Sequence, residues 1–213
     1  MADMNALSEF LQKGKAKDVK ALTQQAVDEG MSPEDILDQG LLSGMNIIGM
    51  KFKNNEVFVP EVLIAARAMN AGMDILKPLL VAGNMESRGT VVIGTVKGDL
   101  HDIGKNLVGM MMKGKGLTVI DLGTDVSPAR FLEEAIQNNA NIIACSALLT
   151  TTMKEMGNVV KAVKDANLQH TIKVMVGGAP VTESYKSSIG ADVYTSDAAT
   201  AAEVALALCK KIS

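Results

Sequence analysis

The chain has 213 residues, which is enough for one large domain or two small ones with a real apolar core. Hydrophobic residues make up 47% of it, but 14 Met against no Trp, 2 Tyr and 4 Phe predict a core that is mainly aliphatic. The formal net charge of −3 argues against a nucleic-acid binder, because such proteins carry a basic surface. No apolar run is long enough to cross a bilayer, and the first ten residues lack a signal-peptide pattern. We therefore expect a cytoplasmic protein with neither nucleic acid nor a membrane as partner.

The cysteines and histidines limit what metal chemistry the protein itself can support. Cys145 and Cys209 are far apart and form no C-x-x-C motif, so neither a disulfide framework nor a zinc site is predicted. With only two histidines in the chain, any metal site must take very few ligands from the protein.

The first eighty residues have the apolar spacing of helices. Apolar positions recur at helical spacing over four segments, 4–11, 19–27, 36–48 and 62–76. Gly30 ends the second segment, and the sequence SPED at 32–35 predicts a helix start, with a hydroxyl N-cap, proline at the first helical position and acids near the helix dipole. Pro60 can open the last helix. Four helices joined by short loops favour an up-down bundle.

A short polar stretch at residues 81–89 separates this part from a second one with a different period. We expect domains at 1–84 and 89–213, joined by a linker at 85–88. In the second part, continuous apolar runs predict strands at 90–96, 117–122, 141–147, 172–177 and, more weakly, 191–195. Helical segments follow them at 103–114, 127–139, 150–166, 180–188 and from 197 to the C-terminus. This alternation predicts an α/β domain with a five-stranded parallel sheet, doubly wound in a flavodoxin-like or Rossmann-like manner.

In such sheets, ligands bind beyond the carboxyl ends of the strands. The loop after the first predicted strand, 94–106, contains neither G-x-G-x-x-G nor a P-loop in register, but it does contain His101 between Asp99 and Asp102. An imidazole that binds a metal usually donates its other N–H to a carboxylate. Asp99 is therefore a candidate partner of a metal-ligating His101. The alternative interpretation is a polar loop whose aspartates cap the next helix.

The pattern G-x-x-x-G-D-x-H-x-x-G at 94–104 resembles the cobalamin-binding module of corrinoid proteins and of cobalamin-dependent methionine synthase. In that family the histidine replaces the cofactor's own benzimidazole as lower axial ligand of cobalt, and the displaced nucleotide tail enters a groove beside the sheet. The resemblance implies that His101 is the metal ligand. It also implies cofactor contacts from this loop by Gly98, Asp99, His101, Asp102, Ile103 and Gly104.

Two stretches after later strands extend the resemblance. Residues 146–152 (SALLTTT) match the family's S-x-L stretch, and this implies that Ser146 hydrogen-bonds the benzimidazole, that Leu148 packs on it and that Thr150 lies near the corrin edge. Thr152 stands where methionine synthase has a serine that extends the His–Asp relay, so Asp99 and Thr152 are the candidate catalytic residues. By itself, the threonine run at 150–152 would predict only a cap of the following helix.

The glycines of the GGA stretch at 177–179 match the family's G-G-A, where missing side chains leave room for the nucleotide tail. The resemblance assigns Gly177 and Gly178 to that tail and Ser196, within TSDA at 195–198, to the end of the same pocket. Without the resemblance, the glycines would predict a tight turn with positive φ, and 195–198 would predict the N-cap of the last helix.

The helical half also resembles the cap bundle that precedes this module in methyltransferase corrinoid proteins. The matching stretches are GMKF at 49–52, VFVPEV at 57–62 and AARAM at 65–69. The resemblance makes Phe58 the candidate apolar group over the upper cobalt face, whereas spacing alone would place Phe58 in a core.

The resemblance implies a methyl carrier in one-carbon metabolism rather than a stand-alone enzyme. In the family's chemistry, Co(I) takes a methyl group from a donor bound to a substrate-specific methyltransferase, and the resulting methylcobalamin passes it to tetrahydrofolate or a thiol through a second methyltransferase. A reductive activase completes the expected partners. Donor choice, among methanol, methylamines, betaines and aryl methyl ethers, lies mainly with the first methyltransferase.

Three alternatives stay open. The small subunit of an adenosylcobalamin mutase shares the D-x-H-x-x-G loop but would not need a helical cap. A cobalamin-dependent sensor or regulator would normally carry a basic recognition helix, whereas residues 1–80 have mixed charge. A flavodoxin-like domain without a cofactor would leave His101 and the glycines of the loop unexplained.

Overall fold

The computed structural model describes residues 2–82 and 88–212, and the chain forms two compact units, one helical and one built around a sheet. The predicted linker at 85–88 lies almost entirely outside the described residues. Among the helices of the described part of the chain, none combines the length and the apolar character that a bilayer crossing requires. Each unit is described below by itself.

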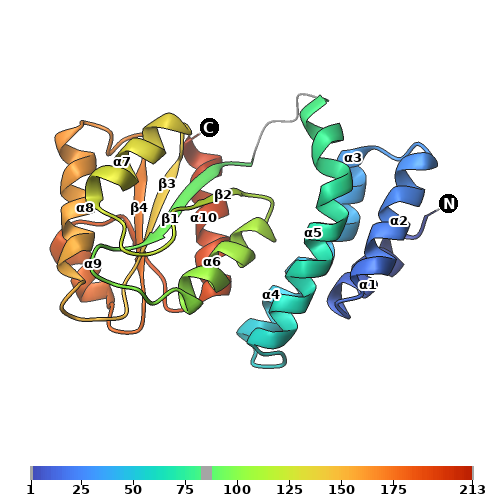
Figure 1. Cartoon of the computed structure of the whole chain (residues 1–213), viewed down its shortest axis with the longest axis horizontal. Helices are drawn as coiled ribbons and strands as arrows, with labels where there is room; N and C mark the ends of the chain where they lie inside the picture. Colours follow the sequence, from blue (N-terminus) through green and yellow to red (C-terminus); the bar gives the residue numbers. More distant parts are fainter. Residues whose placement is uncertain (1, 83–87, 213) are drawn as a thin grey trace. The chain divides into compact units, whose positions relative to one another are not determined.

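The helical unit contains the four predicted helices (Figure 1). They are α1 (Met4–Gln12), α2 (Ala16–Asp28), a continuous stretch made of α3 (Pro33–Asp35), the π-helical η1 (Ile36–Leu42) and α4 (Ser43–Lys53), and α5 (Val59–Ala82). The predicted start at 32–35 is confirmed, because Ser32 Oγ accepts the Asp35 N–H at 3.0 Å and Pro33 is the first helical residue. The last helix begins at Val59, one residue before Pro60.

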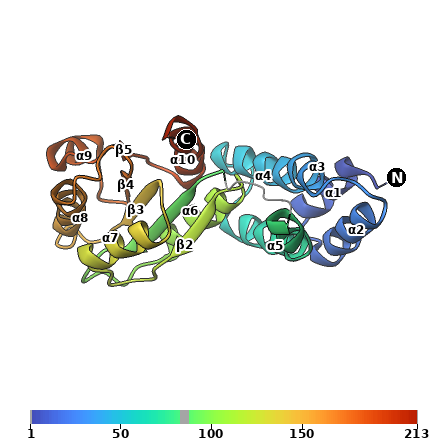
Figure 2. The ribbon, with the colours of Figure 1, turned by 90° about the horizontal axis from the view of Figure 1, so that it is seen from above.

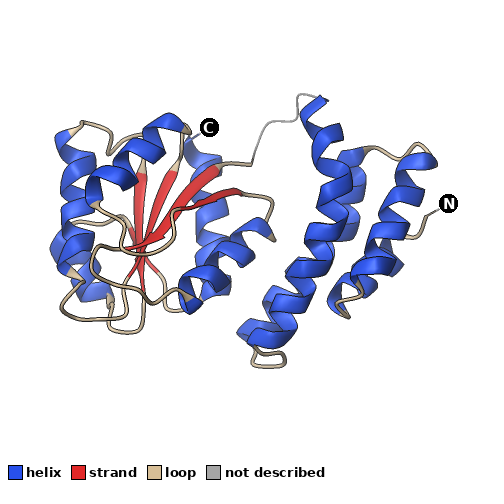
Figure 3. Ribbon diagram, in the orientation of Figure 1, coloured by secondary structure: helices blue, strands red, loops and turns tan. Residues whose placement is uncertain are grey.

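The second unit is a five-stranded parallel sheet with helices on both faces (Figure 3). Its strands are β1 (Thr90–Thr95), β2 (Thr118–Asp121), β3 (Ile142–Ser146), β4 (Lys173–Gly177) and β5 (Val193–Tyr194). Its helices are α6 (Ile103–Lys113), α7 (Pro128–Gln137), α8 (Lys154–Asp165), α9 (Glu183–Ile189) and α10 (Ala198–Ile212). Helices α6 and α10 pack together on one face, while α7, α8 and α9 cover the other (Figure 2). The predicted α/β class is confirmed.

The strand order β2-β1-β3-β4-β5 is the flavodoxin-like one, with all pairs parallel. The order reverses between β1 and β3, so the ligand-binding crevice of such a sheet is expected beyond the carboxyl ends of these two strands. There, Thr95 pairs with Ser146, and the Val96 N–H donates to the Ser146 carbonyl at 3.0 Å. The loops that follow β1 and β3 therefore leave the sheet side by side.

Several boundaries differ from those predicted, and side-chain contacts account for two of the differences. Helix α8 begins at Lys154 rather than near 150, because residues 150–153 form a turn held by a contact described below. Helix α9 begins at Glu183 rather than 180, since Thr182 Oγ1 caps it by accepting the Tyr185 N–H at 3.2 Å. Strand β5 has only two residues, shorter than the predicted 191–195.

Candidate functional site

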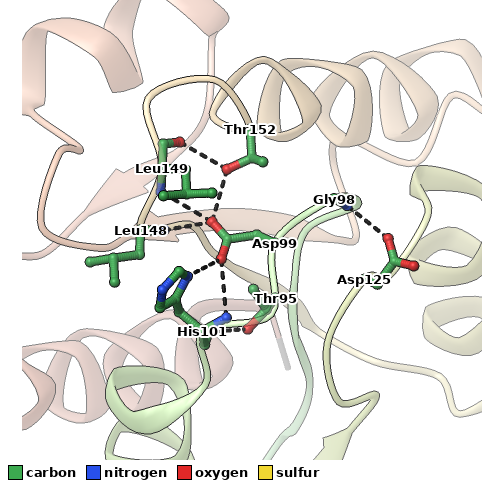
Figure 4. A network of polar contacts seen from close by, with 8 residues as sticks. All are labelled: Thr95, Gly98, Asp99, His101, Asp125, Leu148, Leu149 and Thr152. Atoms are coloured by element: carbon green, nitrogen blue, oxygen red, sulfur yellow. Dashed lines mark hydrogen bonds and ion pairs between the residues drawn. The ribbon is translucent and has the colours of Figure 1, made fainter.

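The centre of the site is the carboxylate of Asp99, which is fully buried and accepts five hydrogen bonds (Figure 4). Its Oδ1 accepts from the His101 backbone N–H at 3.1 Å and from His101 Nδ1 at 2.8 Å. Its Oδ2 accepts from the backbone N–H groups of Leu148 (2.9 Å) and Leu149 (3.1 Å) and from Thr152 Oγ1 (2.8 Å). The loop after β1 is thus attached to the loop after β3 through one side chain.

These contacts determine the charge of the carboxylate. Burial raises the pKa of Asp99, but the hydrogen bonds from His101, Leu148 and Thr152 lower it by more, so the pKa lies well below its usual range. Asp99 is therefore ionised at neutral pH. An ionised carboxylate only accepts hydrogen bonds, so the proton of a neutral His101 ring resides on Nδ1.

His101 is oriented so that its second ring nitrogen remains available. With Nδ1 bound to Asp99, the lone pair of the neutral ring is on Nε2, and the side chain is 52% exposed. Thr95 Oγ1, at the end of β1, donates to the His101 carbonyl at 2.8 Å and fixes the backbone of the loop below the ring. A fixed imidazole with one free nitrogen can ligate a metal.

Large exposed apolar side chains occur near this imidazole in both loops and at the start of α6. They are Leu100, Ile103, Leu148 and Leu149. Leu100 and Ile103 lie within two residues of His101 in the chain, and Leu148 and Leu149 donate their N–H groups to Asp99. Exposed apolar side chains at such a site offer a surface to an apolar ligand. Gly104, in the first turn of α6, adds open space, because a Cβ there would meet nothing within 4 Å.

The remaining predicted residues of the first loop form hydrogen bonds to other parts of the domain. Gly98 has φ +80°, and its N–H donates to Asp125 Oδ1 at 2.7 Å. Asp102 directly precedes α6, and its Oδ2 accepts from Asn106 Nδ2 at 3.0 Å. The alternative interpretation was that the aspartates of this loop cap the next helix. Asp102 does bond to that helix, through the side chain of Asn106, whereas the Asp99 carboxylate bonds to His101 and to the loop after β3.

The predicted residues of the later loops are spread along the carboxyl edge of the sheet. Ser146 ends β3 half-buried, while Thr150 is exposed in the turn before α8. Ser196 is exposed between β5 and α10, and its neighbour Asp197 caps α10 by accepting the Thr200 N–H at 2.8 Å. The stretch at 195–198 thus does contain a helix cap, as its residues alone predict.

Gly177 and Gly178, at the end of β4, differ in the space around them. A Cβ on Gly178 would overlap the Ala147 carbonyl oxygen, and its φ of +133° is one that other residues rarely adopt. A Cβ on Gly177 would make only an ordinary contact, 3.7 Å from the Thr195 carbonyl. Gly178 is therefore required by the fold, whereas nothing in the fold requires Gly177 to lack a side chain.

Phe58 belongs to the helical unit and precedes α5. Its side chain is 64% exposed, so the prediction from spacing alone, a core residue, is wrong. Its backbone N–H donates to Glu61 Oε2 at 3.0 Å, which fixes the start of the helix.

Two residues of this network, Thr95 and Asp125, were not predicted from the sequence. Thr95 ends the mainly apolar strand β1, and Asp125 lies in the loop that follows the second apolar run, three residues after it. A polar residue in a loop beyond the carboxyl end of a parallel strand was the signal available for Asp125.

A doubly wound sheet that presents one imidazole, held by a buried carboxylate within an apolar rim, defines a binding protein for a large cofactor. In the described part of the chain, no group of three or more His, Cys, Asp or Glu could hold a metal ion. Among the described residues, His101 thus belongs to no set of protein ligands that could hold a metal ion by themselves.

Comparison with known proteins identifies the family. A family model described as B12 binding domain matches residues 89–207, and a second model with the same description matches residues 4–77. A corrinoid protein of Desulfitobacterium hafniense strain Y51 is 40% identical over 208 residues, which are 96% of each chain. Dimethylamine corrinoid protein 1 of Methanosarcina acetivorans is 42% identical over 184 residues, 86% of each chain.

Solved structures agree with this. The methanol:cobalamin methyltransferase complex of Methanosarcina barkeri contains a chain that is 30% identical, with a TM-score of 0.87 over 96% of this chain and 78% of that one. A cobalamin-binding protein of Desulfitobacterium hafniense DCB-2 is 28% identical, with a TM-score of 0.79 and full coverage of both chains. The chain belongs to the corrinoid proteins of methyltransferase systems, and its cofactor is a corrinoid such as cobalamin. The resemblance predicted from the sequence is confirmed.

The site fits this cofactor. A corrin supplies four equatorial nitrogens, so a single protein imidazole with a free Nε2 is the kind of donor that its cobalt still lacks. The exposed leucines and Ile103 offer apolar surface to a large macrocycle, and the open space at Gly104 leaves room beside the histidine.

Proposed function

We propose that this chain is a methyl carrier that holds cobalamin with the benzimidazole off cobalt and His101 on it. It receives a methyl group from a donor-specific methyltransferase and presents it to a second methyltransferase that acts on tetrahydrofolate or a thiol. The observation that carries the proposal is the Asp99–His101 pair, with Nδ1 engaged at 2.8 Å and Nε2 free. When bound, the cofactor supplies the cobalt nucleophile and the bond that carries the methyl group.

The chain's own residues would hold the ligand and its proton. Asp99 keeps the proton of His101 on Nδ1 while Nε2 is bound to metal. Hydrogen bonds hold the pKa of Asp99 well below its usual range, so the carboxylate would stay ionised and the proton between the two side chains would stay on the imidazole. Thr152 contributes to this by donating from Oγ1 to Asp99 Oδ2.

The other predicted site residues would contact the cofactor rather than hold its metal. They are Gly98, Asp102, Ile103, Gly104, Ser146, Leu148, Thr150, Gly177, Gly178 and Ser196, together with Phe58 on the upper side. The open Cβ position at Gly104 and the exposed Leu148 support this assignment. For Gly178 the packing requirement is a sufficient reason for glycine, so its contact with the nucleotide tail rests on the resemblance alone.

We also propose that residues 1–84 form a cap domain and residues 89–213 the cobalamin-binding domain, with 85–88 as a linker. The separate family matches at 4–77 and 89–207 support this division. The match in the helical part also favours a methyl carrier over the mutase subunit, which would need no such unit.

The proposed partners are a substrate-specific methyltransferase, a second methyltransferase and a reductive activase, all in the cytoplasm. The 42% identity to proteins named for dimethylamine and trimethylamine makes methylated amines the first donors to test. The similarity to a chain of the methanol:cobalamin methyltransferase complex makes methanol a further donor to test.

The experiment is methyl transfer to the reconstituted chain. Purified protein is loaded with cobalamin, reduced, and mixed with each methyltransferase and its donor carrying a radiolabelled methyl group. We expect label in the protein fraction with one donor and its methyltransferase, and none without reduction. Retention of an adenosyl group on the cofactor, with no label from any donor, would identify a mutase subunit instead.

A further inference from the structure

We propose that Asp125 is a positioning residue that sets the Asp99 carboxylate against His101 and thereby controls how well the imidazole ligates cobalt. This inference rests on the proposed function above, because it concerns the same ligand. Asp125 lies in the loop between β2 and α7, outside the motif that contains Asp99 and His101.

Asp125 contacts two consecutive residues of the ligand loop. Its Oδ1 accepts the Gly98 N–H at 2.7 Å, and its own backbone N–H donates to the Asp99 carbonyl at 3.0 Å. These two contacts hold the peptide unit before Gly98 and the one after Asp99, so they bracket the short segment that carries the Asp99 carboxylate. Figure 4 shows the Gly98–Asp125 bond beside that carboxylate. The side-chain bond joins a charged acceptor to a backbone donor, which makes it stronger than a neutral pair.

The backbone conformation at both positions suits this arrangement. Asp125 has φ +55°, a left-handed conformation that aspartate and asparagine tolerate better than most residues do. Gly98 has φ +80°, which turns its N–H toward Asp125. The Asp99 N–H itself donates to the Val96 carbonyl at 3.1 Å.

The loop that carries Asp125 is itself attached to the sheet. The Thr95 N–H donates to the Gly123 carbonyl at 2.9 Å, and the Val126 N–H donates to the Thr95 carbonyl at 3.0 Å. Val126 is buried and forms a parallel bridge with Val96. The sheet thus fixes the position of Asp125. Asp125 in turn positions the Asp99 carboxylate, whose Oδ1 binds His101 Nδ1 at 2.8 Å.

Three variants separate the acceptor from the loop conformation. D125G keeps the left-handed backbone and the N–H of residue 125 but removes the acceptor. D125N keeps the conformation and a weaker, neutral acceptor. T124G introduces a glycine one position earlier in the same loop and leaves Asp125 in place, which makes it the matched control for loop flexibility.

The full-length chain is loaded with cobalamin and reduced to Co(II), and electron paramagnetic resonance gives the ratio of imidazole-ligated to unligated cobalt. In the cofactor-free chain, nuclear magnetic resonance gives the hydrogen-exchange rate of the Gly98 amide. We expect D125G to lower the ligated ratio about threefold, from the loss of one hydrogen bond, and to speed Gly98 exchange. D125N should lie between D125G and wild type, and T124G should match wild type.

The outcomes separate the two proposals. A wild-type ratio in D125G, or an equal fall in D125G and T124G, overturns the role of Asp125 and leaves the methyl carrier intact. Absence of imidazole coupling in the wild-type protein overturns both. If circular dichroism shows D125G to be unfolded, D125N decides: faster Gly98 exchange with a lowered ratio supports the role, and wild-type values overturn it.

Discussion

A single oxygen of Asp99 accepts both hydrogen bonds from His101, one from its backbone N–H at 3.1 Å and one from its ring Nδ1 at 2.8 Å. The loop backbone and the ring are therefore fixed by the same atom, two residues away in the chain. The other oxygen is used entirely by the loop after β3. The position of the imidazole thus depends on how two loops meet at the switch point of the sheet.

Asp99→Asn should destabilise the protein even though the asparagine side chain has the same shape as that of aspartate. Each carboxylate oxygen faces at least two donors, so either orientation of an amide brings its NH₂ group against N–H groups. We expect the free energy of unfolding to fall by about 2 kcal/mol, measured by urea denaturation. The control is Asp165→Asn, which removes an exposed ion pair with Lys161 and should cost about 0.5 kcal/mol or less.

The difference in unfolding free energy between wild type and Asp99→Asn should also depend on pH. Burial raises the pKa of Asp99, yet its hydrogen bonds lower it by more, so the folded-state pKa lies below the unfolded value of about 4. The stabilisation is therefore fully present above that value and is lost as pH falls toward the folded pKa. The difference in unfolding free energy between wild type and Asp99→Asn should shrink from pH 6 to pH 3. A constant difference would contradict a depressed pKa for Asp99.

Thr152→Val tests the hydrogen bond that the Thr152 hydroxyl donates to Asp99. Valine keeps the branched shape but removes the hydroxyl that donates to Asp99 Oδ2, while the N–H groups of Leu148 and Leu149 remain. We expect a loss of about 1 kcal/mol in unfolding free energy and a higher pKa of Asp99. Thr152→Ser, which keeps the hydroxyl, should retain the low pKa. If serine and valine shift the pKa equally, the hydroxyl is not the cause.

The sequence predicted the sheet and the His101–Asp99 partnership because both are local signals. Apolar runs bounded by turns predict buried strands, and a histidine two residues after an aspartate can bond to it within one loop. The start of α8 was misplaced because the turn at 150–153 depends on the contact of Thr152 with Asp99, 53 residues away. Asp125 was missed for the same reason, since its partner Gly98 lies 27 residues earlier.

The glycine pair shows the same limit, because GGA does not reveal which glycine the fold needs. Gly178→Ala should fail to fold or lose more than about 3 kcal/mol, since its Cβ would overlap the Ala147 carbonyl oxygen in a backbone conformation unfavourable to alanine. Gly177→Ala should keep wild-type stability in urea denaturation. Equal stability of the two variants would contradict the difference in packing.

Phe58→Ala should leave stability nearly unchanged, because the side chain is already 64% exposed. Phe131→Ala is the matched contrast: its ring is fully buried against Gly94, and its removal should cost about 3–5 kcal/mol. If Phe58 shields the cofactor as proposed, Phe58→Ala should also speed air oxidation of the reduced, cobalamin-loaded chain, followed by absorbance. An oxidation rate equal to that of wild type would remove Phe58 from the site.

The central claim, ligation of cobalt by His101, is tested most directly by electron paramagnetic resonance of the Co(II) form in wild type and in His101→Ala. The account predicts nitrogen coupling from a protein imidazole in the wild-type spectrum and its complete loss in the variant, while His170→Ala, at the exposed second histidine, keeps it. Coupling that survives His101→Ala would contradict the assignment.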